Sequence, residues 1–140
     1  ESEYGIRKMT TADMQNAWLE LIDIIKRYKS NGVTKDTFIK MRTTVMDMSI
    51  DPIERAAMYF IINRCSFSGA TLSGGYSNKA ATERFTDSSI DAVSKIDISR
   101  YTITNNDFTA CIKETPDDYF ATFDCFDILK NMKHPEKRTK

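Results

Sequence analysis

The sequence has no excess charge of either sign. Twenty lysine and arginine residues balance 20 aspartate and glutamate residues in a chain of 140. A net charge of zero gives the molecule no long-range field that would attract a polyanion, although a local basic face is compatible with it. Composition is therefore neutral on nucleic-acid binding.

Cysteine is scarce, and long apolar runs are absent. Cys65, Cys111 and Cys125 form an odd, widely spaced set in apolar stretches, unlike a disulfide framework or a paired metal-ligand motif. We expect reduced, buried thiols in an intracellular compartment, either cytoplasmic or within a viral particle. No run approaches the roughly 20 apolar residues that cross a bilayer, and the N-terminus lacks a signal-peptide pattern. We expect a soluble protein with no membrane partner.

Histidine, a frequent general base, occurs once. His134 stands beside Pro135 in a basic tail, residues 130–140, and is expected to be a tail residue rather than a catalytic base. A chain of this length predicts one domain over residues 1–140. We divide it into a helical part (1–64), a glycine- and serine-rich loop (65–86), a helix-strand-helix-strand part (87–129) and the tail.

Helical periodicity dominates the first part. From Thr11, apolar residues recur at helical spacing to Tyr28, and Gly32 ends that helix. Thr34 is a suitable cap for a second helix that is expected to continue to about Met48.

A third helix is predicted from Asp51-Pro52-Ile53-Glu54 to about Asn63. Asp caps a helix, Pro fits its first position, and Glu stands where it completes a capping box. Because Ala56–Ile62 is almost wholly apolar, we expect it to be buried and to carry the Asn63-Arg64 pair rigidly to the edge of the core.

The loop that follows holds three of the five glycines between Ser66 and Asn78. Regular helix is excluded there, and a mobile loop or an irregular hairpin is expected. Lys79, Arg84 and the backbone amides of the loop are placed to approach a phosphate, although a lone glycine-serine loop is more often simply exposed to solvent.

The third part alternates helix and strand. A short helix capped by Asp87-Ser88-Ser89 is followed by a strand over Arg100–Thr104, a helix around Phe108–Ile112 and a strand over Tyr119–Asp124. This order predicts a right-handed crossover between parallel strands. The expected fold is a helix-rich α/β fold, with N-terminal helices on a partial Rossmann-like parallel sheet. Two strands make a marginal sheet with open edges, so another protein chain or self-assembly is expected.

One stretch carries a family resemblance. Asn63-Arg64-Cys65-Ser66-Phe67-Ser68-Gly69 resembles the Asn-Arg-(Cys/Thr)-x-(Phe/Tyr)-(Asn/Ser)-Gly signature of Dam-like, adenine-specific DNA methyltransferases. These enzymes transfer a methyl group from S-adenosylmethionine to the exocyclic amine of adenine. Flanking segments are similar in the same order: Leu19–Arg27, Asp51–Ala57 and Ile103–Phe108.

The resemblance implies roles for individual residues. Asp107 and Phe108 would contact S-adenosylmethionine, while Asn63, Arg64 and the loop that runs through Gly69 and Lys79 to Arg84 would contact duplex DNA in the target-recognition region.

The catalytic motif departs from the family pattern. Where relatives have Asp-Pro-Pro-Tyr, this chain has Asp124-Cys125-Phe126-Asp127. Asp124 is retained and Phe126 offers a ring for base stacking, but both rigid prolines and the tyrosine are replaced. No Gly-x-Gly cofactor loop is found either.

We keep two main hypotheses about the function. The first is a degenerate or partial methyltransferase homologue, inactive alone, that retains DNA contact. The alternative is a structural or assembly subunit, for example of a virus particle, that reuses the scaffold. A hydrolase using Asp124 and Asp127 is the weakest hypothesis, because no histidine, metal-ligand set or activated nucleophile stands near them in the sequence.

Overall fold

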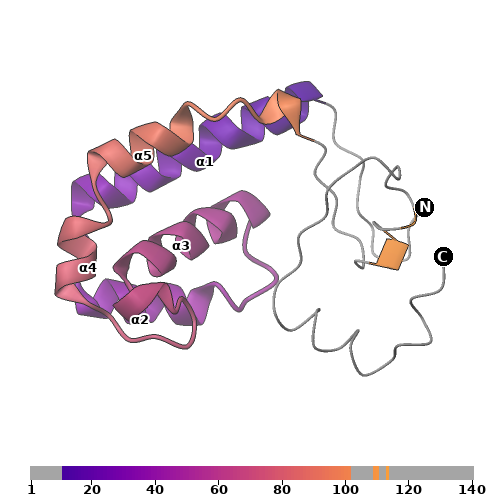
Figure 1. Cartoon of the computed structure of the whole chain (residues 1–140). Helices are drawn as coiled ribbons and strands as arrows, with labels where there is room; N and C mark the ends of the chain where they lie inside the picture. The colour runs from indigo at the N-terminus through magenta and orange to yellow at the C-terminus, as the bar shows by residue number, and fades with distance from the viewer. Residues whose placement is uncertain (1–10, 102–108, 111–112, 114–140) are drawn as a thin grey trace. The chain divides into compact units, whose positions relative to one another are not determined.

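The computed structural model describes residues 11–101, 109–110 and 113 (Figure 1). The chain divides into two compact units, Glu1–Thr102 and Ile103–Lys140, and nearly all described residues lie in the first. The described residues of that unit, 11–101, form five α-helices and two short 3-10 turns. They are α1 (Thr11–Asn31), α2 (Lys35–Thr44), α3 (Pro52–Cys65), η1 (Phe67–Gly69), α4 (Asn78–Glu83), α5 (Asp87–Ser94) and η2 (Ile98–Arg100).

The predicted α/β fold is wrong for the part of the chain that the structure describes, because no β-strand is found there. The expected strand over Arg100–Thr104 begins instead in η2, where the side chain of Asp97 accepts a hydrogen bond from the Ser99 amide at 3.1 Å and turns the chain. A short run of β-branched residues does not by itself outweigh such a local cap. Residues 102–104 and the strand expected over Tyr119–Asp124 lie outside the described residues.

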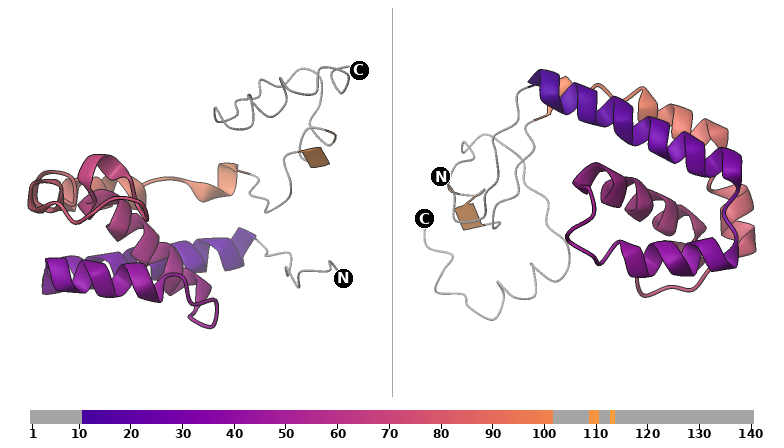
Figure 2. Two further views of the ribbon diagram at one scale, coloured as in Figure 1. Left: turned by 90° about the horizontal axis from the view of Figure 1, so that it is seen from below. Right: turned by 180° about the vertical axis from the view of Figure 1, so that it is seen from behind.

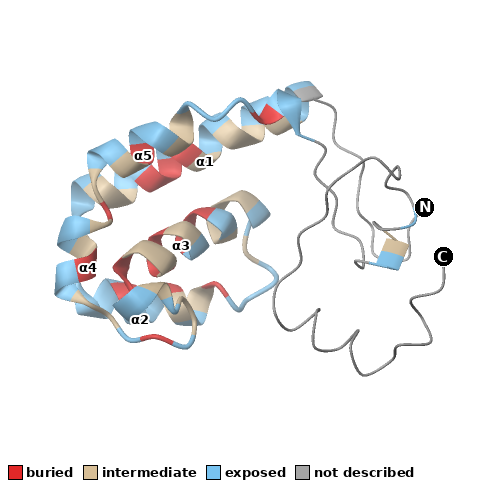
Figure 3. Ribbon diagram, viewed as in Figure 1, coloured by how far each residue is buried: buried red, intermediate tan, exposed pale blue. Residues whose placement is uncertain are grey.

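The helices α1 and α3 pack on each other and carry the other elements, and α2, α4 and η1 contact α3. The helix α1 also contacts α5 and η2, and α5 runs back along it in the opposite direction (Figures 1 and 2). Each of the five helices carries buried residues (Figure 3). The core includes Ile22 and Ile25 of α1, Phe38 of α2, and Ile61 and Ile62 of α3. The helices therefore form a core among themselves, without a sheet.

Local signals for the first three helices are confirmed, except that Glu54 does not complete the capping box expected at the start of α3. Gly32, at φ +77°, follows the end of α1, and Thr34 forms a capping box with Thr37 at the start of α2. At α3, Oδ2 of Asp51 accepts hydrogen bonds from the amides of Ile53 and Glu54, at 3.0 and 3.1 Å. Such bonds satisfy amides that have no partner inside the helix.

The end of α2 and the burial of α3 differ in part from prediction. The helix α2 ends at Thr44 rather than near Met48, and the carbonyl of Val45 accepts a hydrogen bond from Nε of Arg55 at 3.0 Å. The apolar Ala56–Ile62 segment has its buried residues on one side, whereas Tyr59 is 37% exposed.

Residues 65–86 are not one loop as expected. The short helix α4 starts at Asn78, where the hydroxyl of Ser77 accepts a hydrogen bond from the Ala80 amide at 3.1 Å. The cap of α5 is Thr86 rather than Asp87. A helix of six residues is too short for apolar periodicity to reveal it.

Candidate nucleic-acid interface

Residues 66–77, hereafter the hairpin loop, leave the end of α3 and return beside it. Ser66 and Tyr76 form an isolated antiparallel bridge. The Phe67 amide donates to the Gly75 carbonyl and the Ser77 amide donates to the Cys65 carbonyl, both at 2.9 Å. An irregular hairpin, one of the two forms expected here, is therefore what the structure has.

The side chain of Asn63 holds the inside of the hairpin loop. Its Nδ2 donates to the Gly69 carbonyl and lies within hydrogen-bond distance of Oγ1 of Thr71, both at 3.1 Å. Beside it, the fully buried Ser66 hydroxyl donates to the Asn63 carbonyl at 3.1 Å and accepts from the Thr71 amide at 3.0 Å. Asn63 thus shapes the loop from within, and its amide nitrogen is engaged by the protein itself.

Two arginines support the hairpin loop from outside. Nη1 of Arg84 donates to the Ser66 carbonyl at 3.4 Å, and its Nη2 lies 2.9 Å from where a Cβ on Gly69 would stand. Nη1 of Arg42 donates to the Gly74 carbonyl at 2.7 Å. Arg42 is partly buried. The guanidinium groups therefore link the hairpin loop to α2 and to the end of α4.

Arg64 has a different contact. Its Cζ lies 5.4 Å from the centre of the Phe60 ring, an arrangement typical of a cation-π interaction. Its Nε is buried and has no hydrogen-bond partner. The Phe60 ring in turn meets the Phe85 ring edge-on, with centroids 6.5 Å apart.

The structure brings three of the predicted DNA-contacting residues to the base of the hairpin loop: Asn63, Arg64 and Arg84. Lys79 is exposed on α4, outside these contacts. The cofactor candidates Asp107 and Phe108 and the catalytic candidates Asp124 and Phe126 lie outside the described residues.

Sequence reasoning missed Lys29 of α1. Its Nζ lies 5.3 Å from the centre of the Phe85 ring, so Lys29 and Arg64 lie against two rings that touch each other. The available signal was its spacing, because Lys29 follows Ile22 and Ile25 on the helical stripe that forms the core.

The thiol of Cys65 lies in the same region. Burial raises the pKa of Cys65 from its ordinary value of 9.0 to about 11, while the charges of Lys29 and Arg84 act in the opposite direction. Cys65 is free and buried, as expected. The thiol is therefore a protonated part of the core rather than a reactive nucleophile.

The hairpin loop exposes one large apolar side chain. Phe67 is 70% exposed, although the loop that carries it is hydrogen-bonded on several sides. Ser68 and Thr71, in the same loop, have positive φ angles of 52° and 51°. Such backbone strain in non-glycine residues persists only where surrounding contacts impose it, and it is often found at functional sites.

Other site types find no support in the described part of the chain. Within residues 11–101, 109–110 and 113 there is no group of three or more potential metal ligands. The same residues include no helix that is long and apolar enough to cross a membrane.

Neither a protein-family model, nor a curated protein, nor a solved structure matches the chain. The methyltransferase resemblance accordingly rests on the Asn63–Gly69 stretch and its flanking segments alone.

Proposed function

We propose that the helical unit is a DNA-contacting module, related by resemblance to the target-recognition region of Dam-like methyltransferases and without methyl transfer of its own. The observation that carries this proposal is a hydrogen-bonded hairpin loop that presents the exposed ring of Phe67. An aromatic ring held in water has apolar surface left to bury, and nucleobases offer a flat partner on which aromatic side chains stack.

The charges around the loop support the same proposal. Arg64 and Arg84 lie at the base of the hairpin loop, and Lys79 is exposed on α4 just after it. A local basic region of this kind attracts phosphates even when the net charge of the chain is zero.

The test is an anisotropy titration of labelled duplex DNA at low and moderate salt, with the wild-type chain and the Phe67→Ala variant. We expect saturable, salt-sensitive binding, weakened about 5- to 150-fold in the variant, because a ring that inserts at a base step or stacks on a flipped-out base is expected to contribute about 1–3 kcal/mol. Tyr101→Ala is the matched control, since Tyr101 is an aromatic residue, 61% exposed, outside the hairpin loop. Absence of wild-type binding at both salt concentrations would exclude the proposal.

A second arm of the titration adds S-adenosylmethionine. The replaced motif at Asp124–Asp127 leads us to expect no methyl transfer by this chain alone. Incorporation of labelled methyl groups into duplex DNA would contradict that part of the proposal. A cofactor-dependent change in DNA affinity would place a surviving cofactor site in the chain.

A second candidate function is an assembly subunit in an intracellular or viral particle. Two exposed methionines in the turn after α2 favour it: Met46 is 63% exposed and Met48 is 77% exposed. Flexible, exposed methionines are common at protein-binding surfaces. Light scattering after size-exclusion chromatography tests this candidate: an assembly that Met46→Ser and Met48→Ser dissociate supports it, and a monomer at high concentration opposes self-assembly.

A further inference from the structure

The arginines at the proposed DNA interface are already engaged by the protein. Arg84 holds the Ser66 carbonyl and covers Gly69, and Arg64 lies on the Phe60 ring. The Arg84 guanidinium must keep its contacts for the hairpin loop to hold its shape, and Nε of Arg64 is buried. A cation that binds a DNA phosphate without disturbing the loop has to come from elsewhere.

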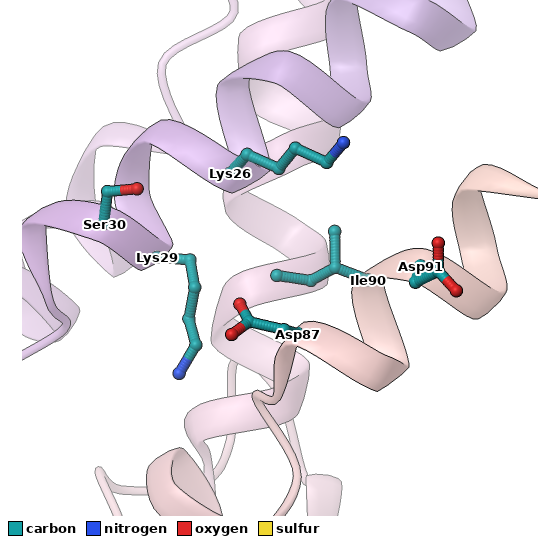
Figure 4. Close-up of a pocket in the computed structure, with 6 residues that line it drawn as sticks. All are labelled: Lys26, Lys29, Ser30, Asp87, Ile90 and Asp91. Carbon is teal, nitrogen blue, oxygen red and sulfur yellow. The ribbon is translucent and has the colours of Figure 1, made fainter.

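Two lysines of α1 make no hydrogen bond to the hairpin loop, although Nζ of Lys29 lies on the Phe85 ring. Lys26 and Lys29 line an open groove of about 390 Å³ between α1 and α5, together with Ser30, Asp87, Ile90 and Asp91 (Figure 4). Neither lysine forms an ion pair with a carboxylate that the structure describes, since the ion pair of this groove joins Asp91 to Lys95 at 2.6 Å. Neither ammonium group is therefore neutralised by direct contact with a described carboxylate.

The position of Lys29 links this groove to the hairpin loop. Its ammonium lies on the Phe85 ring, which follows Arg84 in the chain and touches the Phe60 ring that carries Arg64. Lys26 lies one turn earlier on α1, so the two lysines continue the basic region of the loop along the helix. Phosphates recur along a DNA strand, so a row of cations suits its backbone better than a single charge.

Asp87 acts against these lysines. Its carboxylate extends from the first turn of α5 into the same groove (Figure 4), and it makes no ion pair within 4.0 Å with Lys26 or Lys29. A carboxylate at that position repels a phosphate that approaches the lysines, and the repulsion is screened by salt.

We infer that Lys26 and Lys29 are phosphate contacts of bound duplex DNA, and that Asp87 limits the strength of this contact. The inference rests on the proposed DNA-contacting function. It extends the DNA footprint from the hairpin loop to α1 and assigns phosphate binding to lysines that the sequence did not single out.

The experiment is the same titration, performed at several salt concentrations on variants of the full chain. Lys26→Ala and Lys29→Ala are each expected to weaken binding about 3- to 10-fold and to lower the salt slope by about 1. Lys29→Arg should retain binding, because it keeps the charge. Lys26 is exposed, so its variant tests the inference even if Lys29→Ala disturbs the helix packing. Lys40→Ala is the control, since Lys40 is exposed on α2 and does not line the groove.

Asp87→Asn should have the opposite effect, with tighter binding at low salt. Asp36→Asn is its matched control, because Asp36 is also an acidic residue in the first turn of a helix but lies on α2. The proposed function fails if the wild-type chain does not bind DNA. The present inference alone fails if the wild type binds and Phe67→Ala weakens binding, while the Lys26, Lys29 and Asp87 variants bind like the wild type.

Discussion

Asn63 holds Gly69 across the inside of the hairpin loop, with its Nδ2 3.1 Å from the Gly69 carbonyl. The same nitrogen lies 3.1 Å from Oγ1 of Thr71. One side chain at the end of α3 therefore fixes two points of the loop, and removing it should free the loop without unfolding the helices.

For Asn63→Ala we expect a loss of about 1–3 kcal/mol in the free energy of unfolding, because partly buried partners lose their hydrogen bonds. Hydrogen exchange should accelerate at the Thr71 amide and the neighbouring loop amides, with little change in the middle of α1. Mass spectrometry of exchanged peptides measures this. Equal acceleration in α1 would mean that Asn63 stabilises the whole unit rather than the loop.

Gly69 should not tolerate a side chain. Its φ is +70°, and an added Cβ would lie 2.9 Å from Nη2 of Arg84. Gly69→Ala is expected to cost about 1–2 kcal/mol from the backbone alone, plus the displacement of Arg84.

Gly32→Ala separates the two effects in Gly69→Ala. Gly32 has a similar φ of +77°, but no atom lies within 4 Å of its added Cβ. Gly75→Ala adds a second control, because its Cβ meets open space. Urea denaturation should therefore rank the losses as Gly69, then Gly32, then Gly75. Equal losses for Gly69 and Gly32 would show that the contact with Arg84 costs nothing.

The cap of α3 gives a prediction that does not involve the loop. Asp51→Ala should lower the free energy of unfolding by about 0.5–2 kcal/mol, because the amides of Ile53 and Glu54 lose their acceptor. Asp51→Asn should retain most of the stability, since asparagine caps helices about as well as aspartate does. Thermal unfolding followed by circular dichroism measures both variants, and a large loss in Asp51→Asn would point to the charge instead of the cap.

Cys65 should react slowly with alkylating agents in the folded chain. Burial raises its pKa from 9.0 to about 11, so about one thiol in a thousand is ionised at pH 8, against about one in ten when unfolded. Mass spectrometry of the Cys65 peptide with and without denaturant gives the two rates. Similar rates would contradict the burial.

The raised pKa of Cys65 also makes the free energy of unfolding depend on pH. The folded chain disfavours the thiolate of Cys65, so this contribution to stability is present below pH 9 and is lost as the pH rises toward 11.

The sequence predicts the first three helices because their signals are local. Gly32, Thr34 and Asp51 end or begin helices through their own backbone or side-chain geometry. The helix α4 was missed because six residues are too few for a period. The expected strand from Arg100 failed because Asp97 starts a 3-10 turn just before it.

The candidate site was predictable only in part, for a physical reason. Asn63, Arg64 and Arg84 were identified from their place in the chain, but their partners are set by packing. The contact of Arg84 with Ser66 and the position of Lys29 against Phe85 depend on packing between segments distant in sequence. Asn63 and Arg64, by contrast, contact Gly69 and Phe60, which are near them in the chain.

The bridge between Ser66 and Tyr76 has an evolutionary consequence. Because both ends of the hairpin loop are joined at the end of α3, the residues between them can be lengthened or exchanged without changing the spacing of α3 and α4. Each doubling of loop length costs only about 0.6 kcal/mol of closure entropy. The scaffold can therefore accept a longer loop at small cost, as long as Gly69 and Thr71 keep their contacts with Asn63 and Arg84.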